Sequence, residues 1–277
     1  MAAGWSRRAI VFIEDCLTFG PGVIRPYLGR LLNHSHFVTV RSPNVGTIYI
    51  RPNQSDLASF RQAFVEGQYD LTSTGQGDRL SRYYNHLLAT GTLPIIIDAG
   101  ANVGAGAIWF SKTFPEAKIF ALEPEPANAE ICRRNLASAR NIVLLEGAIA
   151  GRPGFVKIKN AGASWAAQTI RSEEKNGVRI HTITDVLTMA GKPSALFIVK
   201  IDIEGFEADL FAHDTGWISQ TACIFIEPHD WLFPGRKTSR TMQGALFDAG
   251  FEMLLRGENL VFVRDQEDLR VPVPPPD

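Results

Sequence analysis

Ile95-Ile96-Ile97-Asp98-Ala99-Gly100-Ala101-Asn102-Val103-Gly104-Ala105-Gly106 is the segment around which the rest of this chain is organised. It opens with β-branched apolar residues, which are typical of a strand buried on both faces. Its glycines then permit a tight turn, and a helical pattern follows. In an open α/β sheet such a turn lies at the carboxyl ends of the strands, where the free N–H groups of a helix meet ligands. The stretch therefore predicts a strand, a turn and a helix that form a ligand cradle.

The spacing of the glycines distinguishes between nucleotide sites. A dinucleotide fingerprint reads G-x-G-x-x-G, but Asn102 stands two positions after Gly100, so the glycine that admits the pyrophosphate is missing. A P-loop needs Lys followed by Ser or Thr directly after its second glycine, and no such pair directly follows these glycines. NAD is therefore disfavoured and a P-loop nucleotide is excluded. A tight turn without any ligand stays open as an alternative.

Composition narrows the class of protein. The 277 residues include 28 Lys and Arg against 29 Asp and Glu, a net charge of −1, so we expect no nucleic-acid partner. The three cysteines, Cys16, Cys132 and Cys223, are far apart, which favours free thiols and predicts a cytoplasmic location. The apolar run after Arg7 and Arg8 is too short for a transmembrane segment. It predicts an amphipathic helix that packs on the main domain or on a second subunit.

From residue 95 onward, short apolar runs alternate with helical patterns. The runs are Ile95–Asp98, Lys118–Leu122, Ile142–Leu145, Leu196–Asp202 and Ala222–Glu227, and the helical patterns are Ala107–Thr113, Pro126–Ala139, Phe206–Ala212 and Ser239–Ala249. This alternation predicts an α/β fold with a doubly wound, mostly parallel sheet. Two further runs, Gly250–Leu255 and Leu260–Val263, predict a C-terminal antiparallel hairpin and bring the sheet to seven strands.

The N-terminal part has a different pattern. Residues 1–35 are expected to form two helical pieces broken at Gly20-Pro21-Gly22, and residues 36–51 a β-hairpin. Two more helices are expected, one from Ser55 and one over Asp78–Thr90. We therefore predict an N-terminal helical and β-hairpin extension over residues 1–90, the α/β domain over 91–265, and a flexible Pro-rich tail over 266–277. Between the main runs, strand-like pieces are expected around Ala161–Trp165.

An acidic residue follows the second run of the α/β domain. Glu123 lies about 20 residues past the glycine turn, where a carboxylate accepts hydrogen bonds from ribose hydroxyls. Glu125 competes for this role but fits better in the first turn of the next helix. The carboxylate therefore supports a nucleotide-type ligand over a bare turn, without separating NAD from other adenosine ligands.

A family resemblance distinguishes NAD from the other adenosine ligands. The segments Asp98–Gly104, Ala121–Pro124, Glu146–Ala148, Val199–Gly205 and Ile226–His229 occur in the order that resembles the FkbM family of class I S-adenosylmethionine-dependent methyltransferases. The resemblance implies a Rossmann-like seven-stranded fold, S-adenosyl-L-methionine as the cofactor and methyl transfer to a sugar, glycan or polyketide-type hydroxyl. It implies that the cofactor is held by Asp98, Gly100, Ala101, Asn102, Gly104, Glu123, Pro124, Glu146, Gly147 and Ala148, with the residues from Glu146 onward at the adenine.

Ionisable residues gather at the ends of the last two parallel runs. Lys200, Asp202 and Glu204 alternate with apolar residues, so we expect them on one face of the strand, with Glu227 and His229 beside them on the next. Methyl transfer to an alcohol removes a proton, and His229 is our first candidate for the base, with Asp202 second.

Other interpretations of these residues stay open. Asp202, Glu204, Glu227 and His229 could instead bind a divalent metal, but the charge of Lys200 argues against this and we predict none. Glu207 is expected to be an exposed or capping residue, and Trp165 and Trp231 to pack or to stack on an acceptor.

Alternative functions and partners remain. The chain could be an N- or peptide methyltransferase, or a catalytically inactive adenosine-ligand-binding or assembly module. The expected partner is a small-molecule or glycan acceptor. A homo-oligomer through the N-terminal helices is also expected.

Overall fold

The computed structural model describes residues 2–33, 36–160, 167–172, 177–191 and 193–264. A central sheet is made of β3 (Leu93–Ala99), β4 (Lys118–Leu122), β5 (Ile142–Leu145), β10 (Ser194–Ile201), β11 (Cys223–Ile226), β12 (Glu252–Arg256) and β13 (Asn259–Val263). The strand order is β12-β13-β11-β10-β3-β4-β5, and β13 runs antiparallel to the other six strands of this sheet. The predicted seven-stranded, mostly parallel sheet with a terminal hairpin is confirmed.

This strand order fixes where a ligand binds. From β3 the chain steps outward through β4 and β5, then returns to the other side of β3 for β10 and β11. The direction of winding therefore reverses between β3 and β10. In open α/β sheets, ligands bind in the crevice at the carboxyl ends of the strands at such a switch point. The glycine stretch after β3 lies at this crevice.

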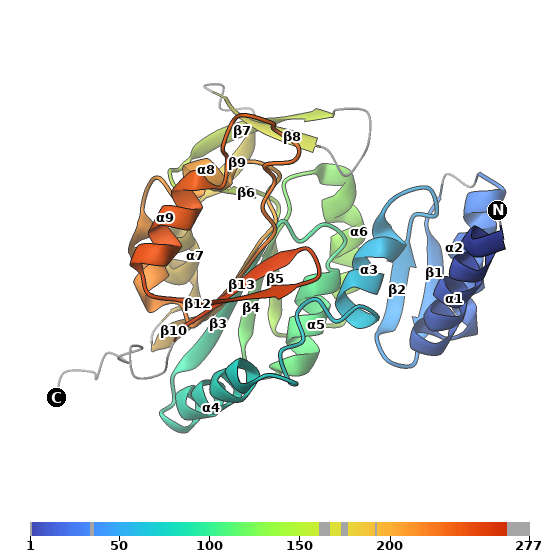
Figure 1. The fold of residues 1–277 in the computed structure, drawn as a ribbon, viewed down its shortest axis with the longest axis horizontal. Coiled ribbons are helices and arrows are strands. Elements are labelled where there is room, and N and C mark those ends of the chain that lie inside the picture. Colours follow the sequence, from blue (N-terminus) through green and yellow to red (C-terminus); the bar gives the residue numbers. More distant parts are fainter. Residues whose placement is uncertain (1, 34–35, 161–166, 173–176, 192, 265–277) are drawn as a thin grey trace.

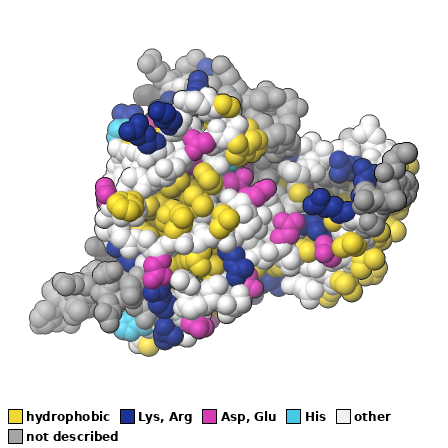
Figure 2. Space-filling view, in the orientation of Figure 1, with side chains coloured by type: hydrophobic (Ala, Val, Ile, Leu, Met, Phe, Trp, Pro, Cys, Tyr) yellow, Lys and Arg dark blue, Asp and Glu magenta, His cyan; other side chains and the backbone are white. Residues whose placement is uncertain are grey.

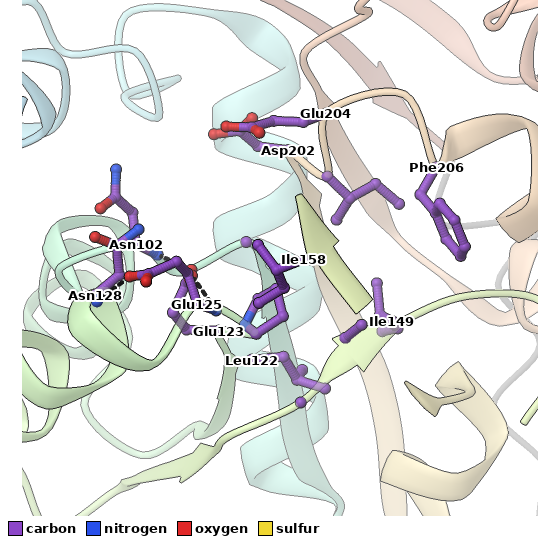
Figure 3. Close-up of a pocket in the computed structure, with 15 residues that line it drawn as sticks. Asn102, Leu122, Glu123, Glu125, Asn128, Ile149, Ile158, Asp202, Glu204 and Phe206 are labelled. Atoms are coloured by element: carbon purple, nitrogen blue, oxygen red, sulfur yellow. Dashed lines mark hydrogen bonds between the residues drawn. The ribbon is translucent and has the colours of Figure 1, made fainter. Parts of the chain in front are cut away.

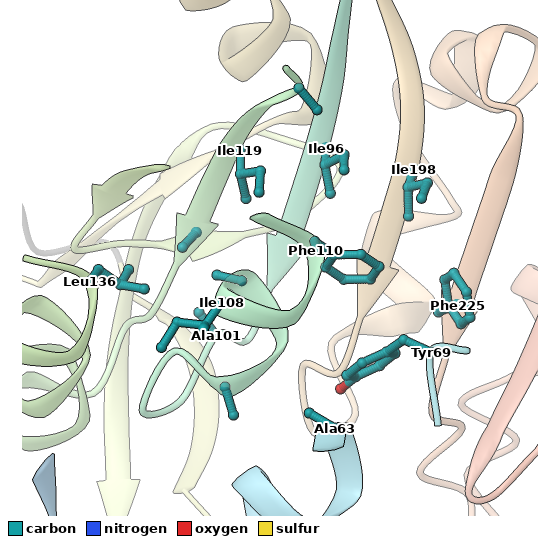
Figure 4. Close-up of a cluster of buried hydrophobic side chains, with 14 of the residues drawn as sticks. Ala63, Tyr69, Ile96, Ala101, Ile108, Phe110, Ile119, Leu136, Ile198 and Phe225 are labelled. Atoms are coloured by element: carbon teal, nitrogen blue, oxygen red, sulfur yellow. The ribbon is translucent and has the colours of Figure 1, made fainter. Parts of the chain in front are cut away.

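Both faces of the sheet are buried, because alternate strand residues belong to two apolar clusters. Ile96, Ile119 and Ile198 pack with Phe110 and Phe225 on one face (Figure 4). On that side lie α4 (Gly75–Ala89), α5 (Ala105–Thr113) and α6 (Pro126–Leu136). On the other lie α7 (Ile183–Ala190), α8 (Glu207–Leu210), the 3-10 helix Thr215–Gln220 and α9 (Arg240–Asp248) (Figure 1). The layers are those of a doubly wound fold.

One helix of this set was not predicted from the sequence. The helix α7 precedes β10 and begins at a capping box, in which the side chains of Thr182 and Asp185 exchange hydrogen bonds with each other's backbone N–H groups. The Thr-x-x-Asp spacing is the signal that could have identified it.

The N-terminal part forms a small layer beside α5 and α6 (Figure 1). It consists of α1 (Ala2–Phe19), the 3-10 helix Pro21–Val23, α2 (Ile24–Leu31), the antiparallel pair β1 (Val38–Ser42) and β2 (Gly46–Ile50), and α3 (Asp56–Phe64). The two helical pieces and the hairpin are as predicted. Asn135 of α6 joins the hairpin to the main domain, accepting from the N–H of Tyr49 at 2.6 Å and donating to its carbonyl at 3.2 Å.

The helix α1 is attached through buried charges. Asp15 is fully buried and forms an ion pair with Arg61 of α3, and its other oxygen accepts from the Tyr27 hydroxyl at 2.5 Å. Burial, together with the hydrogen bond to Asp15, raises the pKa of Tyr27. The predicted boundaries of the extension at residue 90 and of the main domain at 265 stay predictions.

An exposed apolar row covers the outer side of α1 and α2. Its large members are Ile10, Ile13, Leu17, Ile24, Leu28, Leu31 and Leu32. Figure 2 shows hydrophobic side chains gathered at the end of the molecule where α1 and α2 lie, near basic side chains. The oligomer predicted through these helices stays a prediction. Among the described residues, no helix is long and apolar enough to cross a membrane.

A second sheet lies between β5 and α7 in the chain. It contains β6 (Ala148–Ile149), β7 (Gly154–Asn160), β8 (Ala167–Ser172) and β9 (Val178–His181), in the order β6-β9-β7-β8. The strand-like pieces predicted around Ala161–Trp165 lie outside the described residues, as does the tail over 266–277. The three cysteines are free thiols, as predicted.

Candidate functional site

The turn between β3 and α5 is held close to the end of β10. Gly100 has a φ of +78°, and a Cβ atom on it would lie 1.8 Å from the carbonyl oxygen of Asp202. The N–H groups of Gly100 and Ala101 both donate to the carbonyl of Leu122 at the end of β4, at 3.0 and 2.9 Å. Gly104, with a φ of +87°, begins α5. Only glycine combines this conformation with so close an approach of two backbones at residue 100.

Glu123 is buried at the end of β4 and is fixed by two backbone groups. Its Oε2 accepts from the N–H of Asn102 at 2.7 Å and its Oε1 from the N–H of Glu125 at 3.0 Å. Burial raises the pKa of Glu123 to about 7, although both hydrogen bonds favour the ionised form. Glu125 caps α6 by accepting from the N–H of Asn128, as expected for a residue in the first turn.

A cavity opens beside these groups. Its walls are Gly100, Asn102, Leu122, Glu123, Pro124, Glu125, Asn128, Gly147, Ala148, Ile149, Ile158, Asp202, Ile203, Glu204 and Phe206. Figure 3 shows the polar side chains of Asn102, Asn128 and Glu123 on one side and the apolar side chains of Ile149 and Phe206 on the other. A carboxylate for ribose hydroxyls and an apolar wall for a flat ring suit an adenosine ligand. We call this the donor cavity.

Several predicted cofactor residues do not line the donor cavity. Asp98 is fully buried beneath the turn, and Gly104 packs against Cys132 and Leu136 of α6. The side chain of Glu146 is about half exposed and forms an ion pair with Arg133, away from the walls. Of the predicted adenine residues only Gly147 and Ala148 reach the cavity. Ala101 lies on a neighbouring surface described next.

A second cavity adjoins the first and shares Gly100, Asn102, Asp202 and Glu204 with it. Its other walls are Ser55, Ala58, Ser59, Gln62, Tyr69, Ala101, Ala105, Gly106, Lys200, Glu227, His229, Trp231, Leu232 and Glu258. We call this the acceptor cavity. All five residues predicted from the ends of β10 and β11 therefore meet in one place.

The wall supplied by α3 was not predicted. Ser55, Ser59 and Gln62 line the acceptor cavity, and the side-chain amide of Asn102 lies 3.3 Å from the Ser59 hydroxyl, to which it donates. These residues are four and three positions apart, so they form a polar stripe on one face of the helix. That spacing is the sequence signal that could have identified this wall. Residues within the predicted N-terminal extension thus form part of the site.

Lys200 is the buried centre of the site. Its ammonium group donates to the carbonyl of Gly100 at 2.6 Å and lies 3.2 Å from Asp98 Oδ1 and 3.4 Å from Asp202 Oδ2. Burial alone would lower the pKa of Lys200, but Asp98 and Asp202 raise it above its ordinary value. Lys200 therefore stays charged and ties the glycine turn to the end of β10.

His229 has a partner that the sequence did not identify. Its Nδ1 lies 2.7 Å from Glu207 Oε1, and both side chains are almost completely buried. The expectation that Glu207 is exposed or a cap is wrong, because the short helix α8 turns this side chain inward beneath β11 toward His229. The two residues are 22 positions apart, so no local pattern pairs them.

The charges around His229 determine its protonation. Burial would lower its pKa, but the hydrogen bond to Glu207 and the nearby charges of Asp202 and Glu227 raise it to about 9. The ring of the ligand-free protein is therefore protonated at neutral pH and would have to lose that proton before acting as a base. Its Nε2 faces Asp202 Oδ1 at 3.5 Å and Glu227 Oε1 at 3.7 Å.

Glu204 lines the acceptor cavity from a turn, and not from the strand itself as the alternation of residues predicted. The strand β10 ends at Ile201, and Glu204 has a φ of +50° in the turn that follows. Its carboxylate lies beside that of Asp202 (Figure 3). Burial and the Asp202 charge raise its pKa to about 8, and the same two causes raise the pKa of Glu227 to about 7. The rim of the acceptor cavity formed by Asp202, Glu204, Glu227 and His229 thus brings together carboxylates that repel one another.

Comparison with known proteins agrees with this geometry. Residues 98–253, more than half of the chain, match the model of the methyltransferase FkbM domain. The chain is 26% identical over 169 residues to the 2-O-methyltransferase NoeI of Sinorhizobium fredii, which covers 54% of this chain and 69% of that protein. It is 24% identical over 176 residues to the hexuronic acid methyltransferase AglP of Haloferax volcanii, covering 63% and 72%.

A third relative is more similar over a shorter part. The methyltransferase sdnD of Sordaria araneosa is 38% identical over 152 residues, which are 42% of this chain and 59% of that protein. The matched family segment contains the glycine turn, Glu123 and the rim of ionisable residues, and the donor cavity fits an adenosine cofactor. The chain therefore belongs to the FkbM family of S-adenosylmethionine-dependent methyltransferases.

Proposed function

We propose that this enzyme transfers the methyl group of S-adenosylmethionine to a hydroxyl of a sugar-type acceptor. The observation that carries the proposal is the contact between the two cavities. The donor and acceptor cavities share Gly100, Asn102, Asp202 and Glu204, so a methyl group at this junction would face an oxygen on the other side. Alignment of donor and acceptor is the main contribution of a protein to such a displacement.

Each part of the site has a task in this proposal. Glu123 accepts hydrogen bonds from the ribose, and the apolar wall with Gly147 and Ala148 holds the adenine. The cofactor supplies a methyl group bonded to a positively charged sulfur. Lys200 fixes the turn through the Gly100 carbonyl. The wall made by Asp202, Glu204, Glu227 and His229 holds the acceptor hydroxyl and receives its proton.

The acceptor cavity favours a neutral, polar molecule. Four carboxylates line it, those of Asp202, Glu204, Glu227 and Glu258, against the buried Lys200 and His229. Trp231 lines the cavity with 60% of its surface exposed, which suits stacking on a sugar ring. The name of NoeI, a 2-O-methyltransferase, supports an oxygen as the atom that is methylated, and the name of AglP, a hexuronic acid methyltransferase, supports a sugar-type acceptor.

The same carboxylates make an amine the second candidate acceptor, because they would attract an ammonium group. A panel of matched acceptors separates the two: a neutral hexoside, the corresponding hexuronate and the corresponding amino sugar, each offered with cofactor labelled in the methyl group. We expect label on the hexoside oxygen. Label on nitrogen alone would show an N-methyltransferase. No transfer, together with no binding of S-adenosylhomocysteine, would leave a non-catalytic module.

Replacement of His229 tests the part played by this wall of the acceptor cavity. His229→Ala is expected to lower turnover by roughly 10²- to 10⁴-fold, the usual scale for lost acid–base or electrostatic assistance, while the affinity for S-adenosylhomocysteine stays unchanged. An unchanged rate would remove His229 from the chemical step.

We make two further proposals, one on cellular location and one on self-association. The free thiols support a cytoplasmic location. The exposed apolar row on α1 and α2 supports self-association of the enzyme. Light scattering of the wild type and of Leu17→Asp tests the latter, and a wild-type monomer would contradict it.

A further inference from the structure

At the carboxyl ends of β10 and β11, one imidazole and two carboxylates lie close together. Asp202 follows β10, and Glu227 and His229 follow β11. One ligand atom from each side chain lies within 4.8 Å of the other two. The distances from His229 Nε2 are 3.5 Å to Asp202 Oδ1 and 3.7 Å to Glu227 Oε1. Ligand atoms about 2.0–2.2 Å from one ion lie roughly 3–3.6 Å apart. The two distances from His229 Nε2 are close to this range, and the two carboxylate oxygens, which lie within 4.8 Å of each other, would move together to coordinate one ion.

The histidine is oriented as a ligand would be. His229 is 3% exposed, and Glu207, which is 1% exposed, holds Nδ1 at 2.7 Å. A cation would displace the proton from Nε2 while the Nδ1 proton stays donated to Glu207, and the lone pair of Nε2 would then face the acceptor cavity. Nε2 forms no hydrogen bond with any described residue. A carboxylate behind the far nitrogen of the ring is the usual second partner of a metal-binding histidine. This buried pair is an observation independent of the carboxylates in front of it.

Lys200 does not occupy the position. Its ammonium group contacts Oδ2 of Asp202 and is balanced by Asp98 on its other side. The oxygen that faces His229 is Oδ1, which leaves that atom free for another cation. The charge of Lys200, which favoured the absence of a metal in the sequence, therefore does not oppose a cation at Oδ1.

We propose that Asp202, Glu227 and His229 bind one divalent cation in the acceptor cavity. The ligand set of two carboxylates and one imidazole suits an ion that prefers oxygen ligands and also accepts a nitrogen, such as Mn²⁺, with its remaining positions open to the cavity. The ion offsets the excess of carboxylates on this wall.

The consequence for the reaction rests on the proposed O-methyl transfer. An acceptor hydroxyl bound to the cation loses its proton more readily. The oxygen then forms a bond to the methyl carbon while the carbon–sulfur bond breaks and its electron pair stays on the sulfur. The hydroxyl proton passes to Glu204, the carboxylate of this wall that is not a ligand of the cation. His229 acts in this arrangement as a ligand and not as the base.

Mn²⁺ binding to chelator-treated protein tests the site without any turnover. The electron paramagnetic resonance signal of free Mn²⁺ should fall with a stoichiometry of one ion per chain and a Kd below about 100 µM. Glu227→Gln and Glu207→Gln, which changes only the partner of His229, should each weaken binding about 10- to 100-fold. Glu252→Gln, an exposed carboxylate outside both cavities, should bind Mn²⁺ like the wild type.

Titration of the same samples with S-adenosylhomocysteine reports folding and separates the two proposals. Protein that binds S-adenosylhomocysteine but no Mn²⁺ at 1 mM overturns the cation site and leaves the methyltransferase intact. Equal Mn²⁺ affinity in Glu227→Gln and Glu252→Gln places the ion elsewhere and also overturns it. Mn²⁺ binding with the expected losses supports the site even where no acceptor is methylated.

Discussion

Glu123→Gln isolates the contribution of one buried carboxylate to cofactor binding. In the ligand-free protein this carboxylate is 5% exposed and accepts from two backbone N–H groups. Ribose hydroxyls would add donors to an ion that burial disfavours. Replacing a charged acceptor by a neutral one costs about 1.5–3 kcal/mol, because hydrogen bonds to ionised groups are the stronger ones. We therefore expect the Kd of S-adenosylhomocysteine, measured by isothermal titration calorimetry at pH 8, to rise roughly 10- to 150-fold.

The pH dependence gives a second measure. Because the bound hydroxyls favour the ionised carboxylate, cofactor affinity should rise as the pH rises through the pKa of Glu123, about 7. The group is about nine-tenths ionised at pH 8 and one-tenth ionised at pH 6, so the Kd of the wild type should be about tenfold larger at pH 6. Glu123→Gln keeps every other titrating group, including those of the ligand, and should lose this tenfold difference.

A matched variant serves as the control. Glu146→Gln changes a half-exposed carboxylate paired with Arg133, outside the donor cavity, and should leave both the Kd and its pH dependence unchanged. The reasoning is refuted if Glu123→Gln binds S-adenosylhomocysteine within twofold of the wild type, or if its Kd varies with pH as that of the wild type does. A loss in Glu146→Gln would restore the adenine contact that the sequence predicted for that residue.

Three further variants test other parts of the structure. Gly100→Ala forces a Cβ against the Asp202 carbonyl, so it should abolish S-adenosylhomocysteine binding in calorimetry and lower the thermal midpoint by more than about 5 °C, whereas Gly75→Ala, with open space around it, should do neither. Trp231→Ala should raise the KM for a sugar acceptor about 2- to 10-fold with no change in cofactor Kd, and an unchanged KM would remove it from the acceptor wall. Asp15→Ala should cost about 3–5 kcal/mol in denaturant unfolding while cofactor affinity is retained, and an unchanged unfolding midpoint would contradict the role given to this buried pair.

The fold was predictable because its signals are local. Runs such as Ile95–Asp98 are apolar on both faces, and glycines at 100 and 104 mark the turn that follows. The seven strands and the terminal hairpin were therefore expected, and the position of Glu123 followed from its place at a strand end. Alternation along β10 and β11 was also enough to bring Lys200 and His229 to the same site.

What the sequence did not predict depends on contacts between distant residues. The pairing of Glu207 with His229 requires the orientation of a four-residue helix. The direction of the Glu146 side chain depends on Arg133 of the neighbouring helix. Asp98 immediately precedes the glycine turn, yet it points beneath the turn toward Lys200 and lines neither cavity. Periodicity predicts the face of a strand on which a residue lies. It does not predict which residue from a distant part of the chain contacts it on that face.

The two adjoining cavities draw on separate parts of the chain. The donor cavity is built mainly from residues between Gly100 and Ile158, while α3 and Glu258, in the turn between β12 and β13, contribute to the acceptor cavity alone. Substitutions in α3 or in that turn can alter which molecule is methylated without touching Glu123 or the adenine wall. A lineage of such enzymes can therefore acquire new substrates through intermediates that all still bind their cofactor. Directed evolution of acceptor preference should begin at Ser55, Ser59, Gln62 and Glu258.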